Sequence, residues 1–168
     1  MDKYPFFVSQ NEQDYYPEES CGVASFMMLL KAAQIDPLPT HRQLCDELRL
    51  TDPPESRGYN PQDPPVGMYP EDLYSYVVRH NLPFRMHFFN EEWSDCLKVA
   101  PIMVLMAGDE EMFGPESHWL VLVDMQSDQF VYLDTWCKVD EQYVMQLSFE
   151  EFRIYYTGLA LQLLKIKE

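Results

Sequence analysis

Helical and strand-like segments are separated along this 168-residue sequence, with the helices first and the strands second. Apolar residues recur at helical spacing over 20–34, 40–50 and 68–82. From residue 101 onward the apolar runs become shorter and are bounded by turn residues, which is typical of strands. This order favours an α+β fold, in which amino-terminal helices pack on a carboxy-terminal antiparallel sheet, over a doubly wound α/β sheet.

The length fits one domain over residues 1–168. A proline-rich segment, 52–69, interrupts the helical half and is predicted to be a long loop within that domain. The remaining predicted elements are an extended entry segment over 1–10, strands over 84–89, 101–108, 118–125, 129–136 and 159–166, and helices over 90–99 and 148–156.

The charge of the chain excludes several classes of partner. The sequence holds 28 acidic and 12 basic residues, for a formal net charge of −16. Such a surface repels nucleic acid and anionic membranes, and no segment approaches the roughly twenty apolar residues of a membrane-spanning helix. The charge fits an ordinary solvated surface, and it also favours a basic peptide or protein as substrate.

Neither a metal nor a cofactor is expected. The four cysteines are scattered, without a CxxC pair and without a histidine at metal-ligand spacing. The first ten residues do not resemble a signal peptide. We therefore predict reduced thiols and a cytoplasmic protein, or one exported without the usual signal.

One of these cysteines, Cys21, is followed by glycine and opens the apolar helical segment 20–34. The positive end of a helix dipole stabilises a thiolate, and free backbone N–H groups at that end can receive an oxyanion. Ser20 stands where a side chain can cap the helix. Because a cysteine at the head of a buried helix is more often simply packed in the core, this pattern alone assigns no function.

His118 and Asp134 supply the other groups that a thiol hydrolase needs. His118 opens the strand 118–125, and Asp134 lies near the end of the strand 129–136. If the residues between these strands form a tight turn, the strands pair antiparallel and the two side chains come near the same end. A carboxylate placed there can accept a hydrogen bond from the imidazole.

The segments around these residues resemble those of a known family. FFVSQNEQDYYPEESCGVASFMMLL is similar to the opening of papain-like cysteine peptidases of the bacteriocin-processing (double-glycine leader peptidase) type and their stand-alone relatives, with a glutamine, a short spacer, Cys-Gly and an apolar helix. VAPIMVLM resembles that family's strand before the catalytic histidine, SHWLVLVD its histidine strand and FVYLDTW its aspartate strand. The order agrees over nearly the whole chain.

The resemblance implies a papain-like fold and a role for each matching residue. Cys21 would attack a carbonyl, His118 would transfer the proton, Asp134 would hold the imidazole tautomer and Gln10 would donate to the oxyanion. Gln13 is the alternative for the glutamine, and Gln10 is preferred because it directly follows the aromatic entry segment.

Some features depart from this family. Glu18 and Glu19 precede Cys21, where negative charge opposes thiolate formation unless the side chains point away or bind a basic group of the substrate. The proline-rich segment 52–69 has no counterpart in the family. The sequence contains no transporter, so the leader-peptide substrates of the bacteriocin-processing members are not carried over.

The leading hypothesis is therefore a cysteine hydrolase, a peptidase or amidase that cleaves a peptide or isopeptide-like amide through a thioester on Cys21. An acyltransferase or glutamine deamidase with the same core chemistry is one alternative. A non-catalytic acidic protein-binding module is another, although such a module has no physical need of Gln10, His118 and Asp134. The acidic segment 109–117 suggests a basic substrate, which a peptide-library cleavage profile without enrichment of Lys or Arg would contradict.

Overall fold

The computed structural model of the protein describes residues 3–53, 56, 67–88, 92–109, 111–113 and 117–164. Most of the predicted proline-rich loop, residues 54, 55 and 57–66, lies outside the described residues. None of the helices in the described ranges combines the length and the apolar character needed to cross a bilayer.

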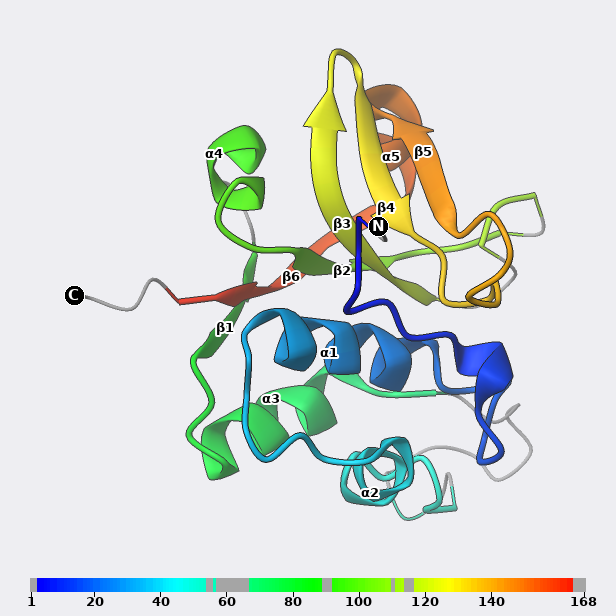
Figure 1. The fold of residues 1–168 in the computed structure, drawn as a ribbon, viewed down its shortest axis with the longest axis vertical. Helices are drawn as coiled ribbons and strands as arrows, with labels where there is room; N and C mark the ends of the chain where they lie inside the picture. Colours follow the sequence, from blue (N-terminus) through cyan, green and yellow to red (C-terminus); the bar gives the residue numbers. More distant parts are fainter. Residues whose placement is uncertain are drawn as a thin grey trace.

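Three helices form one layer of the molecule, drawn below the sheet in Figure 1. They are α1 (Cys21–Ala32), α2 (His41–Glu47) and α3 (Pro70–Arg79). Helix α1 is apolar on nearly every side and is buried over most of its length, as such a helix must be. Helix α2 begins with a capping box, in which Thr40 and Gln43 each bond the backbone N–H of the other.

The strands in the described residues form a single six-stranded sheet with the order β1-β6-β2-β3-β4-β5. Each pair of neighbouring strands is antiparallel, which confirms the predicted α+β class. The strands are β1 (Phe84–Phe88), β2 (Ile102–Met106), β3 (His118–Gln126), β4 (Gln129–Leu133), β5 (Val144–Ser148) and β6 (Tyr156–Leu163), and two short helices, α4 (Trp93–Leu97) and α5 (Phe149–Tyr155), accompany them.

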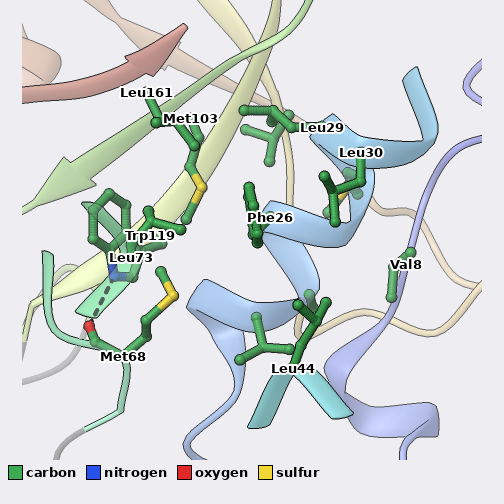
Figure 2. Packing of buried hydrophobic residues seen from close by; sticks show 14 of the residues in the cluster. Val8, Phe26, Leu29, Leu30, Leu44, Met68, Leu73, Met103, Trp119 and Leu161 are labelled. Carbon is green, nitrogen blue, oxygen red and sulfur yellow. Dashed lines mark hydrogen bonds between the residues drawn. The ribbon is translucent and has the colours of Figure 1, made fainter. Parts of the chain in front are cut away.

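The centre of the sheet is buried on both faces, so that alternate side chains of β3 enter different parts of the core. Trp119 and Val121 join the cluster around α1 to α3, whose packing about Phe26 is shown in Figure 2. Leu120 and Leu122 join a second cluster on the opposite face, which includes residues of α4 and α5. An uninterrupted apolar run is what a strand buried on both faces requires.

Several predicted elements differ from those observed. Strand β5 was not predicted, because Val144–Ser148 mixes apolar and polar residues without a clear period. Residues 3–9 form a loop, which agrees with the predicted extended entry segment, whereas the short 3₁₀ helix that follows, η1 (Gln10–Glu12), was not predicted. Ser20 occupies the N-cap position of α1 but makes no capping hydrogen bond. Its hydroxyl lies instead 3.5 Å from the carbonyl oxygen of Pro17.

Candidate active site

Cys21 is the first residue of α1, and its side chain is partly buried. The residue after it must be small, because a Cβ built on Gly22 would lie 2.8 Å from both the Met68 Cε and the Trp119 Cδ1. Trp119 is itself fixed, since its Nε1 donates to the Met68 carbonyl oxygen at 3.3 Å (Figure 2). The glycine thus allows the start of α1 to pack directly against β3.

This packing brings His118, the first residue of β3, to the Cys21 thiol. The two side chains share a hydrogen bond, and each changes the pKa of the other. Burial acts to raise the pKa of Cys21, but the charge of His118, the hydrogen bond to it, and backbone N–H groups of Trp119 and Gly22 together lower it. Residues 97 positions apart therefore form a pair in which the imidazole makes ionisation of the thiol easier.

The pKa of His118 is shifted in the opposite direction. Burial acts to lower it, but the negative charge of Cys21, their hydrogen bond and the charge of Asp134 raise it above its ordinary value. A lowered thiol pKa next to a raised imidazole pKa means that each group favours the charged form of the other, as in a thiolate–imidazolium ion pair. Such a pair places a nucleophile next to a proton donor.

Asp134 lies at the same end of the sheet as His118, as predicted. It follows Leu133, which pairs with Val121 in the hairpin of β3 and β4. The Asp134 carboxylate acts on the imidazole through its charge. Its Oδ1 accepts from the backbone N–H of Trp136 at 2.9 Å, and its Oδ2 lies 3.8 Å from the Cys137 Sγ, so a turn fixes the carboxylate independently of the imidazole.

Gln10 is buried between the Asp134 end of the sheet and the segment that leads to Cys21. Its Oε1 accepts from the Thr135 hydroxyl at 2.5 Å, and its Nε2 donates to the Pro17 carbonyl oxygen at 2.9 Å. Gln13, the alternative predicted for the glutamine role, instead bonds back to the carbonyl oxygen of Ser9 at 2.9 Å. Gln10 is therefore the glutamine that connects the two sides of the site.

Phe113 is a site residue that the sequence did not indicate. Its ring stacks on the His118 imidazole, with the centroids 5.8 Å apart and the planes 16° from parallel. Its φ of 64° is unusual for a bulky residue and marks local backbone strain. The Asp109 carboxylate holds this turn by accepting from the backbone N–H groups of Glu111 and Met112. Nothing in the residue types of this segment distinguishes Phe113 from a surface aromatic.

No family model matches this sequence, and no curated protein matches it. Among solved structures, the peptidase domain of Streptococcus ComA, a bi-functional ABC transporter involved in a quorum-sensing pathway, covers 94% of this chain and 96% of its own, at 18% identity and a TM-score of 0.62. A protein of Bacillus anthracis described as a C39-like peptidase covers 99% of this chain and 96% of its own, at 16% identity and a TM-score of 0.68.

The chain has the fold of the C39 peptidases. The likeness extends over almost the full length of both neighbours, which is what the order of the sequence motifs predicted. At this level of identity it establishes the C39 architecture, while the assignment of individual residues depends on the geometry described above.

The C39 fold of this chain also holds a second cysteine–histidine contact, which differs from the first. Cys45 Sγ lies 3.7 Å from the Nδ1 of His41, one turn away in α2. Burial, with the charges of Asp46 and Glu19, raises the pKa of Cys45 to about 12. Burial alone lowers the pKa of His41. Both groups are therefore neutral at pH 7, and this thiol is inert.

The remaining polar groups give no indication of a metal. Within the described parts of the chain, no group of three or more His, Cys, Asp or Glu side chains could hold a metal ion. All four cysteines are free thiols. His80 and His87 bond to Glu47 and Gln162, respectively, and lie outside the Cys21 site.

The contact of Gly22 with Trp119 yields a test of the local packing. Helix propensity alone predicts that Gly22→Ala stabilises α1 by up to about 1 kcal/mol. The 2.8 Å approach to the Trp119 ring instead predicts overpacking, with a loss of about 1–3 kcal/mol in the free energy of unfolding. Urea unfolding separates the two expectations, because they predict opposite changes in the free energy of unfolding. A stabilised variant would show that the Trp119 ring and Met68 can move aside at little cost.

Proposed function

We propose that this chain is a cysteine peptidase or amidase that hydrolyses a peptide or isopeptide-like amide through a thioester on Cys21. The observation that supports it most directly is the hydrogen-bonded pair of Cys21 and His118, with the thiol pKa lowered and the imidazole pKa raised. A protein-binding module has no need of such a pair. Both structural neighbours named above are peptidases or described as such.

In the proposed reaction the Cys21 thiolate attacks the carbonyl carbon of the scissile amide. Negative charge then develops on the carbonyl oxygen, where the backbone N–H of Cys21 and the amide of Gln10 serve as donors. The His118 imidazolium donates its proton to the leaving amine, and the neutral imidazole later removes a proton from the water that attacks the thioester. Asp134 favours the imidazolium form of His118 through its charge.

The acidic composition of the protein indicates the charge of the substrate. With a net charge of −16, the protein attracts basic peptides over long distances. Glu18 is exposed and Glu19 is partly buried, and they lie three and two residues before Cys21. We therefore propose a basic peptide or protein as substrate.

The pH dependence of alkylation tests the ion pair directly and requires no knowledge of the substrate. Iodoacetamide is expected to modify Cys21 well below the pKa of about 8.5 that a free thiol has, because only the thiolate reacts. Cys45 and Cys137 act as internal controls, since the pKa of each is raised, mainly by burial. Mass spectrometry of proteolytic fragments, after alkylation at a series of pH values, measures each site separately.

The same alkylation experiment can also contradict the proposal. If Cys21 reacts no faster than Cys137 at pH 6 to 7, its thiol is not ionised by His118, and the acyl-transfer mechanism loses its nucleophile. Selective reaction of Cys21 under these conditions is the result that we expect.

A further inference from the structure

The segment that follows Asp134 is bonded at several points to η1. The Gln10 backbone N–H donates to the Thr135 carbonyl oxygen at 2.8 Å, and the Thr135 hydroxyl donates to Gln10 Oε1 at 2.5 Å. Asn11 Nδ2 also donates to the carbonyl oxygen of Trp136. The residue next to the predicted catalytic aspartate is thus joined directly to the predicted oxyanion donor.

Thr135 is fully buried, so its hydroxyl has no access to solvent as an alternative partner. On the opposite side of the Gln10 amide lie two carbonyl oxygens, that of Pro17 at 2.9 Å and that of Glu18 at 3.5 Å from Nε2. Carbonyl oxygens accept and never donate, so the NH₂ end of the amide must face them. The hydroxyl of Thr135 supplies the donor that the oxygen end requires.

The orientation of the Gln10 side-chain amide decides whether it can donate a hydrogen bond to an oxyanion. An amide presents donors at its nitrogen and lone pairs at its oxygen, so a reversed or displaced Gln10 would offer no stabilisation of negative charge. One of its two N–H bonds is directed to Pro17, whereas the contact with Glu18 is at the outer limit of hydrogen bonding. The second N–H makes the weaker contact, and it is the one through which the proposed oxyanion role would act.

We propose that Thr135 is a positioning residue that fixes the Gln10 amide with its nitrogen toward the segment before Cys21. The inference rests on the proposed function and extends it to a residue that does not touch substrate. The side chain carries this role, since the bond from the Gln10 N–H to the Thr135 carbonyl is independent of the residue type at 135.

Thr135→Val tests the proposal, because it keeps the shape of the side chain and removes its donor. Gln10 Oε1 is then buried without a partner, and the amide is expected to leave its position to recover one. With p-nitrophenyl acetate as the probe, the burst of p-nitrophenol measures acylation of Cys21. We expect this rate constant to fall about tenfold, which is less than the hundredfold or more that loss of a whole oxyanion donor costs.

Two further variants separate positioning from general destabilisation. Thr135→Ser retains the hydroxyl and is expected to acylate within about twofold of the unsubstituted chain, as a retained donor requires. In a Gln10→Ala background, Thr135→Val is expected to have no further effect on acylation, because the group through which it acts is absent. The pH midpoint of Cys21 alkylation by iodoacetamide is expected to stay unchanged, since alkylation forms no oxyanion.

Each failure has its own pattern. An equal loss from Thr135→Val in the presence and absence of Gln10, or acylation by Thr135→Val at the rate of the unsubstituted chain, overturns the positioning role and leaves the proposed function standing. Absence of a burst that depends on Cys21 in the unsubstituted chain contradicts the proposed function itself. Circular dichroism at the assay temperature establishes that each variant is folded.

Discussion

Cys21→Ala is expected to abolish the p-nitrophenol burst, with a loss of at least about a thousandfold in the rate of acylation. The reason is chemical, since alanine offers no atom that can form the thioester. The fold should persist, because alanine is the best helix former and Cys21 is only partly buried at the first position of α1. Mass spectrometry provides a second measure, in that the acetyl group should be found on the Cys21 fragment and vanish from the variant.

Cys45→Ala is the matched control. Cys45 also contacts a histidine, His41, but its pKa is raised to about 12 and its side chain is fully buried. Its replacement is expected to leave the burst unchanged and to cost about 1 kcal/mol in stability, on the scale of one buried methylene-sized group. A burst that survives Cys21→Ala and disappears with Cys45→Ala would place the nucleophile in α2 and overturn the proposed mechanism.

Cys21, His118 and Asp134 are candidate site residues with a signal in the sequence itself, whereas the role of Gln10 follows only from the family resemblance. Cys21 was found because a Cys-Gly pair at the head of an apolar helix has a direct electrostatic consequence. His118 and Asp134 were predicted to lie close together because counting residues along a hairpin with a tight turn places both at the same end of its two strands. The structure contains that hairpin, with Ser127 in the tight turn at a φ of 52°. The pairing shifts by one residue between Leu122 and Asp124, which the sequence did not indicate, but both side chains still lie at one end of the sheet.

Features that depend on contacts between distant segments could not be predicted. Strand β6, the last of the described strands, inserts between β1 and β2, and no local pattern specifies that position. The bond from Thr135 to Gln10 joins residues 125 positions apart. Phe113 is placed on His118 by a turn with a strained backbone, which tertiary packing must impose against local preference. In each case the packing of the whole domain decides the outcome.

The acidic residues before Cys21 illustrate why charge cannot be judged from sequence distance. Glu18 and Glu19 were expected to oppose the thiolate unless their side chains point away or bind a basic group. The pKa of Cys21 is lowered because, against the cost of burial, His118 dominates its surroundings. Glu19 contributes instead to raising the pKa of Cys45. The carboxylate that stands two residues from one cysteine thus helps to make another one inert.

His118→Ala is expected to have the second large effect, both on the rate of acylation and on the pH midpoint of Cys21 alkylation. Acylation should fall by about a thousandfold or more, because the thiolate loses the group that forms and stabilises it. The pH midpoint for alkylation of Cys21 should also rise. Burial, which already acts to raise the pKa of Cys21, is then opposed only by the backbone N–H groups of Trp119 and Gly22. Thiolate would therefore appear only at higher pH than in the unsubstituted chain.

Two variants make this result specific to the ion pair. His80→Ala removes an exposed histidine that pairs with Glu47 at 2.9 Å, a surface contact of little energetic value, and should leave both measurements unchanged. Asp134→Asn removes the charge that raises the pKa of His118, so the imidazolium would be lost at a lower pH. The pH range in which acylation is fast would therefore end at a lower pH than in the unsubstituted chain. If His118→Ala left the alkylation midpoint of Cys21 where it was, the start of α1 alone would stabilise the thiolate, and the histidine would not be its partner.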